Sequence, residues 1–549
     1  MEGKKEEVRW VQVAEGKWRR ISRREFLKIA GVGVAAASLG PFIFTEKSVG
    51  ATAPPRGGRL VVLVHHSVYS LSPHDRGYVI RTAVAQIHNA LLEINHNLEV
   101  EPVLAKDFTI SRDGLVWTFN LRQGVRFHDG VEFTSRDVKY TFEWHLDPKN
   151  ASAWADIFSA IDRIETPNKY QVVIRFKYPD ARFLRFGATY PIVPAHYHSQ
   201  VGEDKYKTAP IGTGPFKLKE WRAAEYTLLE AFPQHFRGRP KVDEFMLRVV
   251  PEASVRALAL QTGDAHSSFW NLHPLDNERF SRDPNFIVFR TVDLTLNQFS
   301  LNNKRPQLSD RRVRQAMMYA IDRERMVREI FRGQAVVATA NISPTVKFYY
   351  EPNVKKYTYD PQRANQLLDE AGWTRGADGI REKAGQKLQF TTYVISGDQV
   401  RKPQAEFVQQ ALREVGIRME IREAPWATIY ERLLRGEIDS ALFNWTHGGF
   451  DGEPDATDTL SCKGGTNFHQ FCRTRVDQLL AAGARELDPE RRRRYYSEIQ
   501  KIVAEEVPML YMTYWEWFQI FSRKVQGLPR EALFGPRLYR LAWQWSLMR

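Results

Sequence analysis

The sequence contains only two cysteines, Cys462 and Cys472, and they lie close together. The segment between them, Lys463-Gly464-Gly465-Thr466-Asn467, is rich in turn residues and can bring its ends together. A structural zinc site needs four ligands, so two thiols alone are too few. In an oxidising compartment we expect the pair to form a disulfide that pins a local loop.

Motifs of catalytic chemistry are missing from the sequence. It has no G-x-S-x-G and no H-E-x-x-H segment, and a disulfide would leave no cysteine for catalysis. Gly212-Thr213-Gly214 lacks the Lys-Ser/Thr of a phosphate-binding loop. His65-His66 and His196-x-His198 offer imidazoles that suit nickel, but two such pairs do not define a site. The sequence therefore predicts a protein that is not an enzyme and needs no cofactor, and no metal site is assigned.

The N-terminal segment has the order of an export signal. Residues 22–28, Ser-Arg-Arg-Glu-Phe-Leu-Lys, match the twin-arginine pattern S-R-R-x-F-L-K, with Arg23 and Arg24 as the arginine pair. A weakly apolar stretch follows at 29–44, shorter than the roughly 20 residues of a membrane-spanning helix. Ala51-Thr52-Ala53 then provides a cleavage site. We expect the twin-arginine export machinery to deliver the chain to the periplasm, soluble after cleavage near Ala53.

Charge is spread along the chain. The formal net charge is +14, and charged residues make up 26% of the sequence. Lys and Arg alternate with acids over the whole length, and the densest basic run, Arg491–Arg494, lies beside Asp488, Glu490 and Glu498. That run is typical of a solvated helix face. Because a nucleic-acid-binding protein would gather its basic residues in one stripe, we expect no nucleic-acid partner.

Strands and helices alternate in the second half of the chain. Apolar strands are expected at 388–394, 417–421 and 440–445, separated by helices at 404–415 and 426–434. This β-α-β-α-β order predicts an α/β lobe with a largely parallel sheet.

The remaining segments predict a second, mixed region. Strands are expected at 60–64, 116–121 and 170–176, and a buried aromatic strand is expected at 509–521. Helical spacing extends over 78–92, and the caps Ser135-Arg136-Asp137 and Asp488-Pro489-Glu490 begin two further helices.

Several short phrases, spread over nearly all of the expected mature chain, carry a family resemblance. They are Asp113-Gly114-Leu115, Trp117-Thr118-Phe119, Leu121 to Gly130, Asp137-Val138, Gly212-Thr213-Gly214-Pro215-Phe216, Val313-Arg314-Gln315-Ala316, Tyr319 to Arg323, Ala364 to Gly372, Val415-Gly416-Ile417 and Gly436-Glu437-Ile438-Asp439. Together they make the sequence similar to the extracellular solute-binding proteins of peptide and nickel ABC importers, often called family 5.

The resemblance implies an α/β periplasmic binding protein of type II, with two lobes, an extra inserted subdomain and a hinged ligand cleft. The implied division is a signal peptide at 1–53, lobe I at 54–297 plus 509–549 with the inserted subdomain at about 88–205, and lobe II at 298–508. Crossings near 292–297 and 508–514 would form the hinge. A ligand that contacts both lobes would favour the closed state, and the closed monomer would deliver it to the permease subunits.

The resemblance also suggests ligand-binding residues. In peptide-binding members a cleft strand ends in tryptophan, and an aspartate that follows pairs with the ammonium group of the peptide. Here Asn444, Trp445 and Thr446 match the strand end, and Cys462 with Cys472 matches the pattern that follows. The acid is displaced, because Phe450 stands at the usual position and Asp451 comes one residue later. Either Asp451 takes the role through a shifted loop, or the ammonium anchor is missing.

Other candidate positions have two interpretations each. Arg401 and Lys402 lie near the place where dipeptide-binding relatives hold a cation for the ligand carboxylate, or they are a surface pair. Trp270 either approaches the cleft or packs in the core. Glu453 and Asp455 are expected to be solvated loop acids with helix-capping duty.

The sequence thus predicts the substrate-binding component of an ABC importer for di- or oligopeptides. The alternative is the same role for a non-peptide solute, such as an oligosaccharide, an opine-like compound or a metal chelate. Asn444 and Trp445 could hold such a solute by hydrogen bonding and stacking alone.

Overall fold

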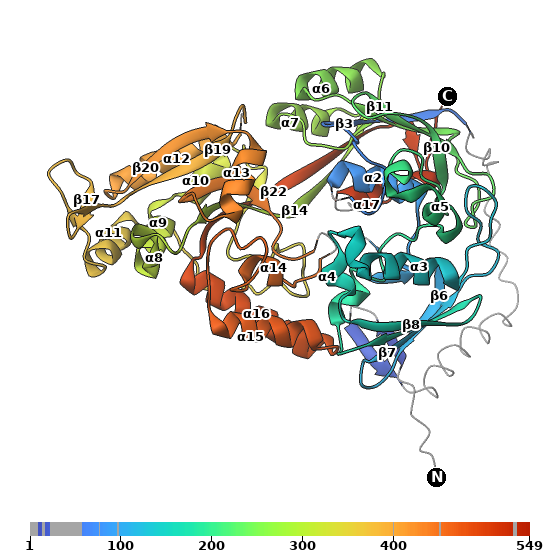
Figure 1. The fold of residues 1–549 in the computed structure, drawn as a ribbon. Coiled ribbons are helices and arrows are strands. Elements are labelled where there is room, and N and C mark those ends of the chain that lie inside the picture. Colours follow the sequence, from blue (N-terminus) through green and yellow to red (C-terminus); the bar gives the residue numbers. More distant parts are fainter. Residues whose placement is uncertain are drawn as a thin grey trace, which may run out of the picture. The chain divides into compact units, whose positions relative to one another are not determined.

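The structure is a computed structural model that describes residues 57–75, 77–95, 98–398, 400–449, 452–530 and 535–548, together with the backbone of the antiparallel strands β1 (Arg9–Val13) and β2 (Lys17–Ile21). The twin-arginine pair Arg23 and Arg24, the cleavage site at Ala53 and the candidate Asp451 lie outside the described residues. The chain divides into two compact units (Figure 1). Unit 1 comprises Met1–Arg290 and Phe518–Arg549, and unit 2 comprises Thr291–Trp517.

Unit 1 is built on a mixed sheet with the strand order β10-β11-β12-β3-β13-β22. Its central strand, β3 (Arg59–Val64), runs parallel to β12 (Glu244–Val249) and β13 (Ser267–Ser268). Leu60, Val62 and Leu63 are fully buried, as expected of an apolar, β-branched run in a strand covered on both faces. The other members of the sheet are β10 (Phe216–Arg222), β11 (Tyr226–Ala231) and the end of β22 (Met509–Ser522).

A second, antiparallel sheet of unit 1 has the order β6-β7-β9-β8. Its strands are β6 (Ala105–Ile110), β7 (Val116–Leu121), β9 (Gln171–Phe176) and β8 (Ile161–Asn168). Helix α3 (Ser135–Leu146) packs against β8 and β9 and begins with a capping box between Thr134 and Asp137. The cap residue is Thr134, one position before the predicted one.

The remaining elements of unit 1 are short. They are α2 (Tyr78–Ile87), β4 (Leu92–Ile94), β5 (Val100–Pro102), η1 (Pro148–Asn150), α4 (Ala155–Phe158), η2 (Ala181–Leu184), α5 (Ala195–Tyr206), α6 (Ala253–Thr262), α7 (Pro274–Arg282), β23 (Val525–Gln526), α17 (Pro536–Tyr539), η3 (Ala542–Gln544) and β24 (Ser546–Leu547).

Unit 2 is built on the strand order β14-β21-β19-β20. The strands are β14 (Phe286–Leu301), β21 (Ser440–Trp445), β19 (Gln389–Ile395) and β20 (Arg418–Ala424). β19 is parallel to both β20 and β21, whereas β14 is antiparallel to β21. The predicted parallel sheet of this region is therefore confirmed for three strands. Helix α12 (Arg401–Glu414) packs on β19 and β20, and α13 (Trp426–Leu434) packs on β19 (Figure 1).

Further elements complete unit 2. They are α8 (Pro306–Ser309), α9 (Arg311–Ala320), α10 (Arg323–Glu329), β15 (Ala335–Val337), α11 (Pro361–Glu370), β16 (Thr374–Arg375), β17 (Arg381–Lys383), β18 (Gln386–Lys387), α14 (Thr457–Leu460), α15 (Thr474–Arg485) and α16 (Pro489–Glu506). The chain passes between the units twice, once within β14 and once within β22.

The helix predicted over 78–92 is shorter than expected, because α2 ends at Ile87 and Leu92 begins β4. Gly214 donates its backbone N–H to the Ile87 carbonyl at 2.8 Å, which takes up one of the open acceptors at the helix end. A Cβ atom at Gly212 would lie 2.1 Å from that same oxygen. The glycines of this phrase therefore allow the close backbone approach that ends the helix.

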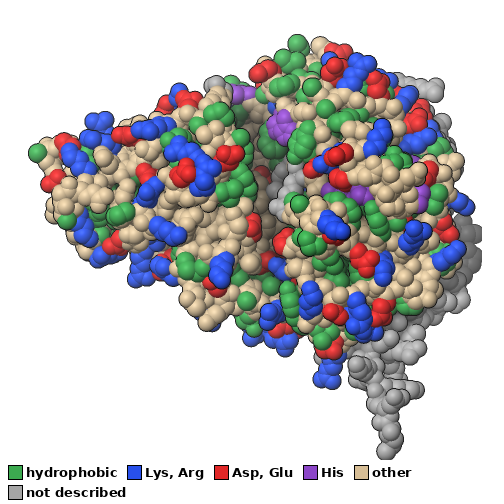
Figure 2. Space-filling view, viewed as in Figure 1, with side chains coloured by type: hydrophobic (Ala, Val, Ile, Leu, Met, Phe, Trp, Pro, Cys, Tyr) green, Lys and Arg blue, Asp and Glu red, His purple; other side chains and the backbone are tan. Residues whose placement is uncertain are grey.

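Basic side chains are scattered among acidic ones on the face shown in Figure 2. In the run 491–494, Arg491 pairs with Glu486 at 2.8 Å and Arg493 with Glu490 at 3.4 Å, both on the surface. Arg492, however, is buried. The prediction of a solvated helix face is therefore wrong for this residue, because α16 turns it toward the interior of unit 2.

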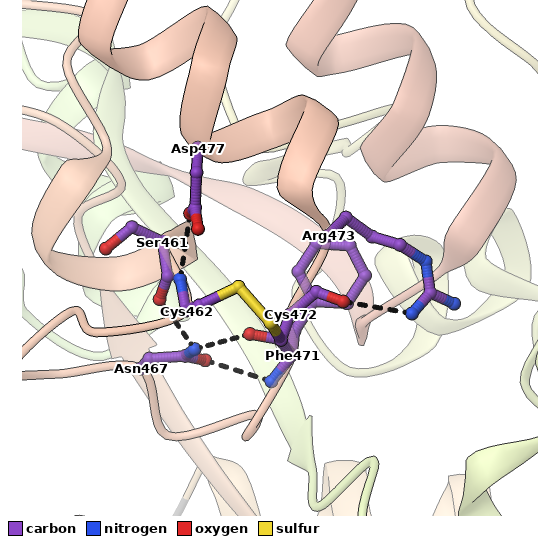
Figure 3. The surroundings of a disulfide bond; sticks show 7 residues. All are labelled: Ser461, Cys462, Asn467, Phe471, Cys472, Arg473 and Asp477. Atoms are coloured by element: carbon purple, nitrogen blue, oxygen red, sulfur yellow. Dashed lines mark hydrogen bonds between the residues drawn. A yellow bond between two sulfur atoms is a disulfide. The ribbon is translucent and has the colours of Figure 1, made fainter.

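The predicted disulfide between Cys462 and Cys472 is confirmed, with Cα atoms 4.4 Å apart (Figure 3). The loop that it closes is also held by hydrogen bonds. The Asn467 amide donates to the carbonyls of Ser461 (2.9 Å) and Phe471 (2.6 Å), and the Cys462 N–H donates to Asp477 of α15 at 2.9 Å. The covalent bond thus fastens a loop that already has a frame of polar contacts.

Replacing both cysteines by serine should lower the free energy of unfolding by about 2–3 kcal/mol, the chain-entropy contribution of a loop this short. Urea unfolding of the mature protein measures this difference. Dithiothreitol should destabilise the unaltered protein by the same amount and leave the double variant unchanged. An equal effect of the reductant on both proteins would contradict the assignment.

Candidate functional site

Two sequence-predicted residues meet at one edge of the unit 2 sheet. Because β19 and β21 are parallel, their carboxyl ends lie at the same edge, the usual place for ligands in open α/β sheets. Asn444 lies near the end of β21, and α12 begins at Arg401 after β19. The Arg401 guanidinium donates to the Asn444 side-chain oxygen at 2.8 Å. The two residues therefore form one polar group, although 43 positions separate them.

Buried amides fix the orientation of Asn444. Asn297, its partner across β14 and β21, donates to the same Asn444 oxygen at 3.0 Å. Gln404 of α12 in turn donates to the Asn297 oxygen at 2.5 Å, and both of these side chains are fully buried. These two bonds to the Asn444 oxygen fix which end of its side-chain amide is the acceptor and which is the NH₂ donor.

The charge of Arg401 is compensated by Asp398, whose carboxylate accepts from its guanidinium. The same carboxylate accepts the backbone N–H of Arg401 at 2.8 Å and so begins α12 three residues before the predicted start. Burial alone would raise the pKa of Asp398, but the Arg401 cation and the backbone donor hold that pKa below its ordinary value. Asp398 was not among the residues expected at the site, although an acid just before a helix is a recognisable signal.

Arg401 is also placed by an aromatic ring. Its guanidinium carbon lies 4.8 Å from the centroid of the Trp515 ring, within the range of a cation–π contact. The Nε of Arg401 and the indole N–H of Trp515 are buried without a partner in the part of the chain that the structure describes. By contrast, Lys402 pairs with Glu423 at 2.7 Å on the surface. The surface interpretation therefore fits Lys402 and not Arg401.

Trp445 is half-buried and packs against the aromatic cluster of unit 2. Its ring centroid lies 5.0 Å from that of Phe468, edge to face, and 6.1 Å from that of Tyr430. The contacts on the core side hold the indole in one orientation. Because successive side chains of a strand point to opposite faces, the Trp445 ring lies on the α13 side of β21 and the Asn444 amide on the α12 side.

A small cavity opens beside the chain that follows Trp445, lined by residues that include Thr446, His447 and Asn341. Neither amide atom of Asn341 nor the Thr446 hydroxyl has a partner among the residues that are described, and all three atoms are buried. Water or a polar ligand group would satisfy them. Asn341 was not selected from the sequence, since it lies in an irregular segment without a motif.

The imidazole of His447 is neutral and structural. It hydrogen-bonds to the Gln298 oxygen at 2.7 Å and to the Thr459 hydroxyl at 3.0 Å. Burial lowers the pKa of His447 to about 3, so the ring carries no charge at neutral pH. Gly448 follows with φ 128°, and a Cβ atom there would lie 2.3 Å from the Glu453 carbonyl, which explains the glycine.

The expectation of a solvated acid at Glu453 is wrong. Glu453 is 2% exposed and forms an ion pair with the buried Arg492 of α16. Arg492 also donates to the Gly483 carbonyl at 2.8 Å and lies 5.3 Å from the ring of Tyr496. Asp455 remains near the surface and accepts from the Thr457 hydroxyl at 2.7 Å, at the start of α14. The pair with Arg492 fixes the position of Glu453 against α16.

Trp270 belongs to unit 1, where it follows β13. Its ring is half-buried and stacks on His65, which follows β3, with centroids 4.1 Å apart. Burial lowers the pKa of His65 to about 2, with the neighbouring His66 and Arg256 acting in the same direction. Trp270 and His65 thus form a neutral aromatic pair at the carboxyl ends of two parallel strands.

Residues 99–467 match the family described as bacterial extracellular solute-binding proteins, family 5. The chain belongs to this family. Residues 20–40 match the twin-arginine translocation pathway signal sequence. This family 5 protein is therefore an exported, periplasmic substrate-binding component of an ABC importer and not an enzyme. Among the helices that are described, none has the length and apolar composition of a membrane span.

Several family 5 relatives are named for peptides. The chain is 29% identical to oligopeptide-binding protein AppA of Bacillus subtilis, over 90% of this chain and 94% of the relative. It is 30% identical to probable di/tripeptide-binding protein 5 of Pseudomonas aeruginosa, over 78% and 84%.

Solved structures share the fold. That of AppA from Bacillus subtilis in complex with a nonapeptide has a TM-score of 0.78 and 26% identity, covering 90% of this chain and 100% of the other. That of NikZ from Campylobacter jejuni in complex with Ni(L-His) has a TM-score of 0.80 and 25% identity, covering 89% and 99%. These likenesses agree with the two-lobed α/β binding-protein fold expected from the sequence.

Replacing Glu453 by Gln should lower the free energy of unfolding by about 3–5 kcal/mol, because Arg492 would remain buried without a countercharge. Chemical unfolding of the mature protein measures the loss. Glu498→Gln is the matched control, because Glu498 lies on α16, like Arg492, and pairs with Arg475 at 2.8 Å on the surface. This control should leave the free energy of unfolding unchanged. Equal effects of the two substitutions would contradict the assigned role of the buried pair.

Proposed function

We propose that this family 5 protein binds di- or oligopeptides in a closing cleft and, as a monomer, delivers them to the permease of its importer. The polar edge of unit 2 carries the proposal: Arg401 and Asn444 are held side by side near the carboxyl end of β21, the strand that ends in the half-buried Trp445. A peptide backbone needs such donors for its carbonyl groups or its terminal carboxylate. The relatives named for peptide binding support the same class of ligand.

At Arg401 and Asn444 the arrangement favours recognition of the polar groups of the ligand backbone. Asp398 compensates the charge of Arg401, so the site does not present an unpaired cation. We propose that Asp451, two positions before Glu453 in the sequence, pairs with the peptide ammonium. A peptide lacking that ammonium would then leave a carboxylate without its partner.

The same transport role for a non-peptide solute is the second candidate. The neutral pair of Trp270 and His65 in unit 1 offers a flat aromatic surface that suits a ring or a chelate as well as a side chain. The likeness to NikZ, whose structure contains Ni(L-His), favours a metal chelate within this class.

Titration with a set of dipeptides and tripeptides, followed by tryptophan fluorescence and calorimetry, tests the peptide proposal. We expect binding of one ligand per chain, and N-acetylation should weaken it by at least about a hundredfold. Asp451→Asn should remove most of that discrimination. Equal affinity for free and acetylated peptides would exclude the ammonium anchor. A non-peptide solute retained through purification and found by native mass spectrometry, with no response to peptides, would favour the second candidate.

Arg401→Gln should weaken peptide binding by about tenfold to a hundredfold, because it removes a charged donor and releases Asn444. Lys402→Gln is the control, because the neighbouring Lys402 pairs with Glu423 on the surface. The affinity of this variant for the peptide should stay within twofold of that of the unaltered protein. Both variants need unaltered circular dichroism for the comparison. Equal affinities of the two variants would remove Arg401 from the site.

A further inference from the structure

Unit 1 contains a group of metal-ligating side chains that the candidate ligand site does not include. His74, His198 and Glu203 each offer one ligand atom, and these atoms lie within 4.8 Å of one another. One oxygen of Glu203 is 2.6 Å from His74 Nδ1 and 2.9 Å from His198 Nε2. The two histidines are buried and the glutamate is half-buried, so the group is largely shielded from bulk solvent.

The fold holds these three side chains in place. His198 and Glu203 belong to α5, and Gly202 interrupts that helix with φ 75° and ψ 166°. His74 comes from a turn far away in sequence, and its ring stacks on Trp144 with centroids 3.9 Å apart. The backbone carbonyl of His74 accepts from the indole of Trp154 at 3.0 Å. The convergence is therefore built by tertiary packing and is not a chance meeting of flexible surface groups.

The second nitrogen of His198 is already engaged. Tyr140 of α3 lies with its hydroxyl 2.7 Å from His198 Nδ1. When Nδ1 carries the proton and donates to this hydroxyl, Nε2 presents its lone pair toward Glu203. Metal-ligating histidines usually have such a hydrogen bond on the nitrogen that does not bind the ion, because it fixes the tautomer and the ring.

Hydrogen bonding within the protein leaves this group incompletely satisfied. His74 Nε2 and the second Glu203 oxygen are buried and have no partner among the described residues. If the group is only a hydrogen-bonded cluster, one oxygen of Glu203 accepts both imidazole N–H groups, and the Ser72 side chain is a further donor to this carboxylate. Buried polar atoms without partners are costly, and each one calls for an explanation.

We propose that His74, His198 and Glu203 bind one divalent transition-metal ion, with zinc as the best match. Two imidazoles and a carboxylate are a common zinc ligand set that leaves a fourth position for water. Bonds of 2.0–2.2 Å in a tetrahedron separate ligand atoms by roughly 3.3 Å, so the side chains need to move by under about 1 Å. The ion would neutralise the carboxylate, and water at the fourth position would supply partners for the free atoms.

This ion would be resident in unit 1 and separate from any transported solute, since the group shares no residue with the candidate ligand site. The proposal therefore goes beyond the proposed function and does not depend on it. The sequence analysis named His198, together with His196, as a possible nickel ligand. In the structure His196 instead pairs with Asp129 at 2.7 Å, and His74 and Glu203 complete the group.

Calorimetric titration of the mature protein, stripped with EDTA, with Zn²⁺ alone tests the proposal. We expect one equivalent to bind with a dissociation constant in or below the micromolar range, and elemental analysis after dialysis should find one zinc per chain. Glu203→Gln and His198→Asn should each abolish this binding. Tyr140→Phe keeps all three ligands and should weaken binding by about 10- to 100-fold. The double variant His65→Gln/His66→Gln is the control and should retain the full affinity.

Cobalt supplies a readout that does not depend on stability. Co²⁺ bound in place of zinc should give visible d–d absorption in the unaltered protein and in the His65/His66 control, and none in Glu203→Gln. Should His198→Asn fail to fold, Glu203→Gln and Tyr140→Phe, checked by circular dichroism, decide the question. Absence of saturable zinc binding by the unaltered protein would overturn the proposal. Zinc binding that Glu203→Gln, His198→Asn and Tyr140→Phe all retain would also overturn it, as would binding that is lost only in the His65/His66 control.

Discussion

Backbone pairing along two long strands, β14 and β22, is the constraint on which both units depend. A strand interior cannot leave its N–H and C=O groups unpaired when it is buried, and residues 509–514 of β22 are all buried. β22 pairs with β13 in unit 1 and with β15 in unit 2, and β14 pairs with β21. The strands that end at candidate ligand residues are therefore placed by the same two elements that carry the chain between the units.

The candidate site of unit 2 follows from that pairing. Asn297 and Asn444 are opposite each other in the register of β14 and β21, which brings their side-chain amides within hydrogen-bonding distance. Arg401 joins them because Asp398 begins α12 close to the same sheet edge. Each polar group thus has a partner that orients it, and the Arg401 charge is balanced before any ligand arrives. Such preorganisation lowers the entropic cost of holding a ligand.

Two buried arginines of unit 2 have partners that compensate their burial. Arg492 and Glu453 form a buried ion pair. Arg314 donates hydrogen bonds from its guanidinium to the backbone carbonyls of Leu308, Ser309, Glu506 and Val507. Arg314 thereby joins α9 to α8 and to the end of α16, and Arg492 joins α16 to α15. The disulfide performs the same task covalently for the loop between α14 and α15.

Local patterns in the sequence were enough to determine the export signal, the alternating elements of 388–445 and the disulfide, because each depends on residue types at short spacing. The family was also recognisable, since its phrases mark turns and caps. Arg401 contacts Asn444, 43 positions away, and Arg492 contacts Glu453, 39 positions away. Only the tertiary structure decided these two pairings. The sequence says which residues are polar. Whether a polar residue is buried depends on which face of its helix packs against the rest of the chain. For that reason a solvated run was expected where one arginine is in fact buried.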